Sequence, residues 1–429
     1  MAKFGLTLAI VLVSAKWGAS ATQPKGLCLS GTNHSHAPIA GNCSSTYELG
    51  DYKSTLREWM LLAEKRDISG QFNLGQLYRR GQGVPKNDET AVKWYTLAAK
   101  QGYASAQFNL SFMYRTGRGV QKNEKTAVKW YALAAEQGHV KSQYNLGEMY
   151  ERGLGVPQDA ETALKWYTLA AEQGHVKSQV KLDVVHNKGQ GVAPNQTMAA
   201  QWNELSAEQG DAIAQFNMGA MYDEGVGVPE NRKVAVKWYT LAAEQGHVKS
   251  QYNLGVMYER GLGVSENHEI AAKWYTLAGE QGNAEAQYNL GVMYERGLGV
   301  PQDAKTAAKW YTLAGEQGDA DAQYNLGVMY ERGLGVTKNQ KTAMKWYTLA
   351  AEQGDASAQI SLGNAYGRGQ GVIQDNVYAH MWLNIAASSG ISKDAIINRD
   401  IIAKRMTLAD ISAAQKLARE CVVKKYKGC

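Results

Sequence analysis

The stretch Gln287–Gly318 reads QYNLGVMYERGLGVPQDAKTAAKWYTLAGEQG, and similar copies of it occupy most of the chain. Its tryptophan recurs every 36 residues, without insertion or deletion, at Trp94, Trp130, Trp166, Trp202, Trp238, Trp274, Trp310, Trp346 and Trp382. A fixed period of this length is typical of solenoids, in which each repeat packs only against its neighbours. The sequence therefore predicts one elongated array rather than several globular domains.

The first half of each copy has the periodicity of an amphipathic helix. In the quoted copy we expect this helix over Ala286–Arg296, with its buried face at Gln287, Leu290, Gly291 and Tyr294. Gly297 and Gly299 are expected to end it, because glycine tolerates the left-handed conformation that commonly follows a helix.

The second half predicts another helix, from about Lys305 to Glu316. Its expected buried stripe consists of Ala307, Trp310, Ala314 and Gly315. The small residues allow close helix approach, and the tryptophan is expected to fill the space between neighbouring repeats. Because one helix pair leaves an apolar face uncovered, stability is expected to depend on the whole array.

Each copy follows the same order of residues: Leu-Gly, Tyr, Gly-x-Gly-Val, Ala, Trp-Tyr, Ala-Ala and Gln-Gly. This pattern resembles the Sel1-like repeat, a relative of the tetratricopeptide repeat. The resemblance covers about Tyr47 to Ser392. It implies an all-α fold, a right-handed α/α superhelical solenoid of nine 36-residue helix-turn-helix repeats with N- and C-terminal capping helices. It also implies use as an adaptor or scaffold, without catalysis in most members.

The two ends of the predicted array, residues 47–392, differ from its repeats. Residues 47–68 are expected to form a degenerate capping unit, in which Trp59, Leu62 and Ala63 reproduce the spacing of Trp94, Leu97 and Ala98. Nine full repeats are expected from residue 69. Residues 393–429 are expected to form two closing helices and a tail, the second helix starting at a capping box, Thr407 to Asp410, with Leu408, Ile411, Leu417 and Cys421 on one side.

Met1–Ala21 has the features of a secretory signal peptide. Lys3 supplies the positive charge, residues 4–13 form an apolar run, and Ala19-Ser20-Ala21 is a cleavage sequence. The run is too short to span a membrane. We therefore expect cleavage near Ala21, a periplasmic or secreted location, and no stable membrane span afterwards.

All four cysteines lie outside the repeats. In the polar segment 22–46, Cys28 and Cys43 are expected to form a disulfide in an exported protein. The alternative is a zinc site made by Cys28, His34, His36 and Cys43, although this spacing matches no standard finger. Cys421 and Cys429 are candidates for a second disulfide, with a free C-terminal thiol as the alternative.

The fourth copy, Lys177–Ala212, departs most from the others. Its substituted positions are Val180, Asp183, His186, Lys188, Asn203 and Ser206. Either the copy has drifted without functional consequence, or it forms a specialised pocket or partner contact near His186 and Asp183.

The sequence predicts no enzyme, cofactor or metal site in the repeats. The Gly-x-Gly of each copy follows a helix rather than a strand, which argues against a nucleotide-binding loop. Carboxylates such as Glu295 and Glu316 are interpreted as solvated charges. Some cysteine-rich relatives of this repeat bind or hydrolyse β-lactams, but they carry a disulfide in each repeat, which is absent from these repeats. The net charge of +6 is too small and dispersed to indicate nucleic acid.

The first helices offer the most plausible functional surface. The wheel positions opposite the buried face are those of Asn289, Val292 and Arg296. In solenoids of this type the first helices line the concave face. The candidate partner-binding residues are Asn145, Asn217, Asn253, Asn289, Asn325, Val256, Val292, Val328, Arg260, Arg296 and Arg332.

The asparagines would hydrogen-bond an extended peptide, the valines would contact apolar side chains, and the arginines would favour carboxylates. Alternatively, the asparagines and valines only stabilise the stack. The leading hypothesis is a non-enzymatic, exported scaffold that binds protein or peptide partners in the groove of the array. The alternative is a protein that binds peptidoglycan or another cell-wall component, with β-lactamase-like hydrolysis least favoured.

Overall fold

A computed structural model describes residues 52–189, 193–388 and 393–429, and every regular element in these ranges is an α-helix. The predicted signal peptide, Cys28 and Cys43 lie outside the described residues. The chain divides into two units, residues 1–158 and 159–429, and each is considered by itself. The boundary falls between the two helices of the third copy.

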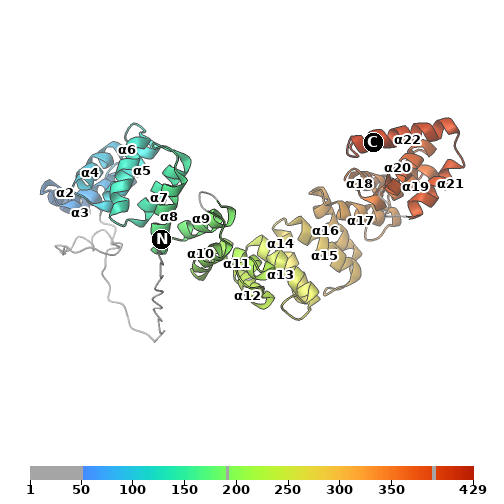
Figure 1. Cartoon of the computed structure of the whole chain (residues 1–429), viewed down its shortest axis with the longest axis horizontal. Helices are drawn as coiled ribbons and strands as arrows, with labels where there is room; N and C mark the ends of the chain where they lie inside the picture. The colour runs from blue at the N-terminus through green and yellow to red at the C-terminus, as the bar shows by residue number, and fades with distance from the viewer. Residues whose placement is uncertain (1–51, 190–192, 389–392) are drawn as a thin grey trace, which may run out of the picture. The chain divides into compact units, whose positions relative to one another are not determined.

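The described part of the first unit contains six helices that pack in chain order (Figure 1). They are α2 (Tyr52–Glu64), α3 (Ile68–Arg80), α4 (Asp88–Lys100), α5 (Ala104–Thr116), α6 (Glu124–Glu136) and α7 (Val140–Arg152). Helices α3, α5 and α7 are the first helices of their repeats, and α4 and α6 are second helices.

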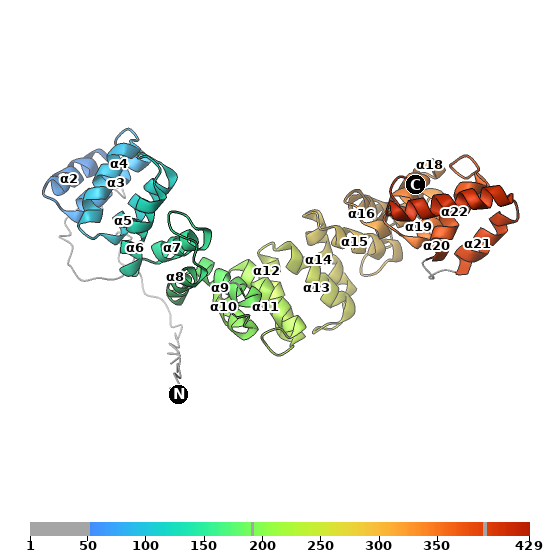
Figure 2. The same cartoon turned by 45° about the horizontal axis from the view of Figure 1, so that its top comes forward.

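The second unit continues the alternation of first and second helices (Figure 2). Its helices are α8 (Ala160–Glu172), α9 (Val176–Lys188), α10 (Gln196–Glu208), α11 (Ala212–Glu224), α12 (Arg232–Glu244), α13 (Val248–Arg260), α14 (His268–Glu280), α15 (Ala284–Arg296), α16 (Ala304–Glu316), α17 (Ala320–Arg332), α18 (Gln340–Ala351), α19 (Ala356–Arg368), α20 (Asn376–Ser388), α21 (Lys393–Ala403) and α22 (Leu408–Val423).

Within each unit, a first helix packs against the second helix of its own repeat, and that second helix packs against the next first helix. This neighbour-to-neighbour packing confirms the predicted helical solenoid. Within the second unit, direct backbone contacts also join α13 to α15, α15 to α17 and α17 to α19. First helices of successive repeats therefore form one continuous layer.

Short-range sequence signals set the helix ends. Asp303 N-caps α16, because its carboxylate accepts a hydrogen bond from the amide of Lys305. Gly297 ends α15 in the left-handed region, with φ of 72°, as predicted. Gly299 also has positive φ, and a Cβ there would collide with the backbone of His268 in the preceding repeat. Glycine is thus required at position 299 for two reasons: the backbone of the preceding repeat lies too close for a Cβ atom, and φ is positive.

In seven of the nine repeats the central aromatic residue is the tyrosine after the tryptophan. Tyr311 is fully buried, and its ring lies so close to Gly291 that a Cβ there would overlap it. Trp310, predicted to lie in the buried stripe, is only partly buried and packs near Gly279 of the preceding repeat. The tryptophan therefore fills the junction between repeats, as expected, while the tyrosine fills the core. On the first helix, Met293 rather than Tyr294 completes the buried face.

A buried glutamine joins each repeat to the one before it. Gln287 Nε2 donates a 2.8 Å hydrogen bond to the carbonyl oxygen of Gly279, near the end of the preceding second helix. Gln317 Nε2 then donates to Gln287 Oε1 at 2.7 Å. The bond from first-helix glutamine to preceding carbonyl recurs at Gln71, Gln107, Gln143, Gln179, Gln215, Gln251, Gln323 and Gln359. The carbonyl also accepts a backbone hydrogen bond, from Gly282 in the case of Gly279, so the glutamine adds a second bond that links the two repeats.

The same bond fixes the register of the N-terminal capping helix. Gln71 donates to the carbonyl of Ala63, just as Gln107 donates to that of Ala99 one period later. Trp59 therefore corresponds to the buried Tyr95 and not to Trp94. Trp59 is accordingly 8% exposed. The spacing expected from sequence was wrong by one residue because two adjacent aromatic residues each offered a match.

In the fourth copy the paired positions of the core are exchanged together. Asp183 stands where most other copies have the glycine, and Asn203 stands where most have the tyrosine. Their side chains are 4% and 1% exposed. Burial raises the pKa of Asp183 to about 6, which a hydrogen bond from Asn203 partly opposes. Among the described residues, Asp183 Oδ1 and the fully buried hydroxyl of Ser206 have no hydrogen-bond partner.

His186 is also buried, and its Nδ1 donates to the carbonyl oxygen of Leu182 at 2.7 Å. Because both His186 and Asp183 point into the protein, their positions favour altered core packing over a surface contact with a partner. The fourth copy is therefore a polar interruption of an otherwise apolar core.

The C-terminal helices α21 and α22 both pack against α20. As predicted, α22 begins at a capping box formed by Thr407 and Asp410. Its buried residues are Ala414, Ala418 and Cys421. Leu408, predicted on the same side, is 86% exposed, because it lies on the first turn, beyond the contact with α20.

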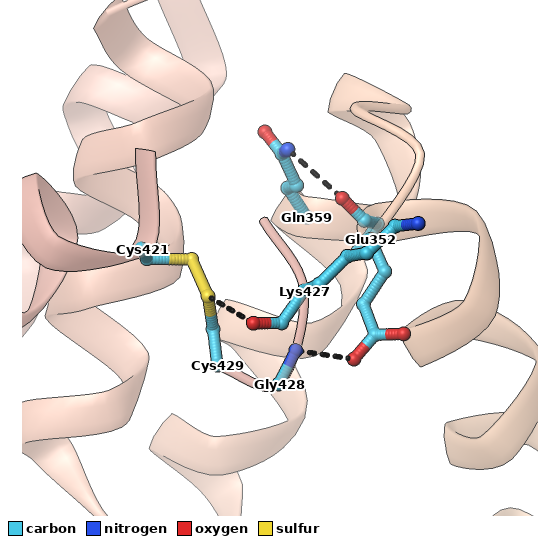
Figure 3. The surroundings of a disulfide bond; sticks show 7 residues. Glu352, Gln359, Cys421, Lys427, Gly428 and Cys429 are labelled. Carbon is cyan, nitrogen blue, oxygen red and sulfur yellow. Dashed lines mark hydrogen bonds between the residues drawn. A yellow bond between two sulfur atoms is a disulfide. The ribbon is translucent and has the colours of Figure 1, made fainter. Parts of the chain in front are cut away.

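Cys421 and Cys429 form a disulfide, which confirms this predicted pair (Figure 3). The amide of Gly428 donates to Glu352 Oε1 at 3.0 Å, and the ring of Tyr426 lies over Gly354. The tail therefore lies against the C-terminal end of α18.

Replacing Gln287 by Ala is expected to destabilise the chain by about 1–3 kcal/mol, because the buried hydrogen bonds that its side chain makes with the Gly279 carbonyl and the Gln317 amide are lost. Gln302→Ala is the matched control, since its amide donates to the Glu295 carbonyl in an exposed turn. Urea unfolding followed by circular dichroism measures both. Equal costs for the two variants would contradict the role of the buried glutamine.

Tyr311→Ala is expected to cost about 3–5 kcal/mol, because it opens a cavity at a fully buried site. Trp310→Ala should cost less, since the indole is only partly buried. Thermal unfolding of the two variants compares them directly. A larger loss of stability in Trp310→Ala would mean that the tryptophan, and not the tyrosine, is the principal core residue.

Asp183→Asn is expected to stabilise the chain at neutral pH. The raised pKa means that Asp183 contributes most favourably below its unfolded-state value of 3.8, and this contribution is lost as the pH rises through about 6. The variant should therefore exceed the parent by up to about 3 kcal/mol at pH 7 and match it near pH 4. Thermal melting across this range tests the expectation, with the exposed Glu161→Gln as control. A gain that does not change with pH would contradict it.

Candidate partner-binding surface

Most of the predicted partner-binding residues lie on the first-helix layer of the second unit. Helices α11, α13, α15 and α17 carry Asn217, Asn253, Asn289 and Asn325 at equivalent positions, and the last three also carry the predicted valine and arginine. Because α13, α15 and α17 contact one another in succession, their equivalent positions fall in rows. Asn145 lies on α7 in the first unit and is treated separately.

The three valines are shared between the surface and the core. Each is partly buried and packs against the apolar cluster that contains the fully buried tyrosine beside it: Val256 with Tyr275, Val292 with Tyr311, and Val328 with Tyr347. Their remaining exposed surface forms a short apolar strip. The buried part of each valine fits a role in stabilising the stack, and the exposed part fits contact with the apolar side chains of a partner.

Four of the five predicted asparagines contact polar groups of the preceding repeat, and Asn145 bonds within its own helix. The side chains of Asn253, Asn289 and Asn325 hydrogen-bond the hydroxyl groups of Tyr239, Tyr275 and Tyr311 respectively. Asn217 Nδ2 donates to Asn203 Oδ1 at 3.3 Å, and Asn145 Nδ2 donates to the Lys141 carbonyl at 2.6 Å. The amides are partly exposed, so they join the stack and also face solvent.

Three glutamates that the sequence analysis treated as solvated are part of this network. Tyr275 donates to Glu259 at 2.7 Å, Tyr311 to Glu295 at 2.7 Å, and Tyr347 to Glu331 at 2.9 Å. Each glutamate is partly buried. Burial is the main cause that raises the pKa of each tyrosine, and the neighbouring carboxylate raises it further. The hydroxyls therefore stay protonated and act as fixed hydrogen-bond donors.

The sequence contained a signal for this pairing, since each glutamate stands 16 residues before its tyrosine. It was missed because the two residues belong to different helices. A second row, Tyr252, Tyr288 and Tyr324, was missed as well. Each of these rings is partly exposed and lies 5.8–5.9 Å from a buried tyrosine ring.

The arginines Arg260, Arg296 and Arg332 are exposed at the C-terminal ends of α13, α15 and α17. The face therefore presents aromatic, amide, aliphatic and guanidinium groups once per repeat. These groups suit hydrogen bonding and apolar contact with another molecule. Among the described residues, no group of three or more His, Cys, Asp or Glu side chains is arranged to hold a metal ion. Nor does any described helix have the length and apolarity needed to cross a membrane.

The family model for the Sel1 repeat matches nine segments of the chain: residues 68–103, 104–139, 140–175, 184–211, 212–247, 248–283, 284–319, 320–355 and 356–391. The shortened fourth match omits 176–183, which ends at the substituted Asp183. The comparison with curated proteins gave no match.

Two solved structures resemble the chain over most of its length. One is c5321, a protective antigen present in uropathogenic Escherichia coli strains and displaying an SLR fold, with 34% identity, a TM-score of 0.53, and coverage of 90% of this chain and 92% of that one. The other is a Sel1 repeat protein from Oxalobacter formigenes, with 30% identity, a TM-score of 0.57, and coverage of 79% and 97%. Together with the nine matched segments, these similarities show that the chain belongs to the Sel1 repeat family.

Proposed function

We propose that this protein is a non-enzymatic, exported scaffold that binds protein or peptide partners along the first-helix face of α13, α15 and α17. Sel1 repeat proteins are typically protein-interaction scaffolds, which gives the general class. The observation that carries the specific proposal is the row of equivalent groups on this face. Tyrosine, asparagine, valine and arginine recur there in the same environment in three successive repeats.

Such a face suits an extended peptide. Partly exposed amides can pair with a peptide backbone, while the valine strip contacts apolar side chains and the arginines contact acidic ones. Each contact is weak, but contacts repeated along one partner add to its affinity. The glutamate–tyrosine–asparagine network holds the face in place and reduces the entropy lost on binding.

Two features support export. Residues 1–21 have the sequence pattern of a signal peptide. The Cys421–Cys429 disulfide is typical of proteins that reside in an oxidising compartment.

Binding to the cell wall is less well supported. Sugar recognition often uses exposed aromatic rings, but the second-helix tyrosines Tyr275, Tyr311 and Tyr347 are fully buried. Core packing therefore explains the second-helix tyrosines, whereas the first-helix row of Tyr252, Tyr288 and Tyr324 is partly exposed. Co-sedimentation with purified peptidoglycan would distinguish this alternative from the scaffold.

The triple variant Val256→Gln, Val292→Gln, Val328→Gln tests the proposed face. Gln76 occupies the equivalent position in the first repeat, so the substitutions are compatible with the fold. We expect a nearly unchanged melting temperature and a strong loss of partners recovered by proximity labelling in the native host. The matched control is Lys273→Gln, Lys309→Gln, Lys345→Gln, on the exposed side of the second helices. An unchanged set of labelled proteins in the valine variant would refute the proposed face.

A further inference from the structure

An exposed leucine recurs on the second helices, three residues after the tryptophan. On the described second helices of the second unit, from α8 to α18, these leucines are 43–44% exposed: Leu169, Leu205, Leu241, Leu277, Leu313 and Leu349. A single exposed leucine needs no explanation, whereas apolar side chains gathered on one face mark interaction sites. Because equivalent positions repeat along the array, these side chains form a leucine row.

The leucine is retained even where the core beside it is not. On α10 of the fourth copy, Asn203 replaces the buried tyrosine and Ser206 replaces a buried alanine. Leu205 lies between them and is 44% exposed, as in the other copies. The core of α10 therefore gains little from this leucine, which points to a role at the surface.

Each leucine of α12, α14 and α16 lies between two charges of opposite sign. On α16, Lys309 precedes Leu313 by four residues and Glu316 follows it by three, so all three share one helix face. The side chains of all three are exposed. The same exposed trio recurs on the two preceding second helices: Lys237, Leu241 and Glu244 on α12, and Lys273, Leu277 and Glu280 on α14.

The second helices thus present a lysine row, the leucine row and a glutamate row side by side. Lys273 also pairs with Glu269 of its own helix at 2.9 Å, but both side chains are well exposed, so this pair is weak and easily exchanged.

At the C-terminal end the chain itself covers this position. Ile385 on α20 is equivalent to the leucines, yet it is only 3% exposed. It belongs to the same apolar cluster as Ala418 and Cys421 of α22, and α22 packs against α20. The flanking charges are absent there, since Met381 and Ser388 stand in their places. This face therefore accepts a packed helix, and a partner for the open part of the row must also meet charges of both signs.

We propose that the leucine row on α12, α14 and α16 is the contact surface for a second copy of this chain. A two-fold rotation about an axis parallel to the row places leucines against leucines and each lysine row opposite the glutamate row of the other copy. An axis parallel to the helices would instead oppose lysines to lysines, so charge selects the first arrangement.

Several repeats must take part in this contact, because a stable interface commonly buries roughly 800 Å² per partner. The inference goes beyond the proposed scaffold function and concerns a different face. The first helices α13, α15 and α17 stay open to other proteins in such a dimer.

Sedimentation velocity of the full chain over a wide range of concentration tests the proposal. We expect a reversible monomer–dimer equilibrium that salt weakens. Replacing three leucines of the row by glutamine should weaken dimerisation at least about tenfold, with an unchanged melting temperature because the sites are exposed: Leu241→Gln, Leu277→Gln and Leu313→Gln. The matched control changes three exposed apolar residues outside the row and should keep the dimer: Ile213→Gln, Leu334→Gln and Ile373→Gln.

Charge reversal tests the orientation. The acidic variant is Lys237→Glu, Lys273→Glu, Lys309→Glu, and the basic variant is Glu244→Lys, Glu280→Lys, Glu316→Lys. Each should be monomeric alone, because its like charges face one another, and an equal mixture of the two should dimerise. The control Lys53→Glu, Lys65→Glu, Lys86→Glu makes the same change of net charge on exposed sites of the first unit and should dimerise alone.

A chain that stays monomeric, larger open-ended species in place of a dimer, or a mixture that does not dimerise would overturn the proposal. If the chain is monomeric while the leucine variant loses labelled proteins in the native host, the row binds another protein and the second copy is rejected. The lysine control of the valine test should dimerise more weakly and keep its labelled partners, which separates this face from the scaffold face.

Discussion

The hydrogen bond from a buried glutamine to the end of the preceding second helix is the constraint on which the array depends. Gln287 is buried, and burying its side-chain amide without partners would be costly. It donates to the Gly279 carbonyl, which also accepts from the Gly282 amide, and it accepts from Gln317. Because the acceptor and donor belong to successive repeats, the bond also fixes how far one repeat is displaced from the next. It recurs even at Ala63, so it determines where the array begins.

Inside each repeat a second constraint couples two positions on different helices. The tyrosine ring occupies the space that a side chain at the facing glycine would need, as at Gly291 and Tyr311. The fourth copy changes both positions, to Asp183 and Asn203, which keeps the site filled but makes it polar. The second copy shows a milder solution: Ser111 replaces the glycine and satisfies its hydroxyl by donating to Gln107 of its own helix. The fourth copy, by contrast, leaves the Oδ1 atom of the buried Asp183 carboxyl group without a hydrogen-bond partner among the described residues.

Periodicity was sufficient to predict the helices, the glycine ends and the alternating packing, because these depend on residues close in sequence. Contacts between helices were harder to predict. The preference for Tyr311 over Trp310 in the core depends on which of two adjacent aromatic residues faces Gly291, and a helical wheel separates them by only about 100°. The glutamate–tyrosine bonds escaped prediction because a charged residue at a helix end is usually solvated. The buried face of Gln287 was found, but its bonding partner lies in another repeat and has no local signature.

The array keeps its tyrosine hydroxyls almost constant and varies the residue beside them, so the chemistry of the face is set by one position per repeat. Where that residue is Glu259, Glu295 or Glu331, the hydroxyl is satisfied internally and the surface gains stability but no unmet donor. Where it is Arg79 or Arg115, the tyrosine hydroxyl lies beside a guanidinium group instead of a carboxylate. The tyrosine is the same in these repeats, so its own packing does not require a glutamate beside it.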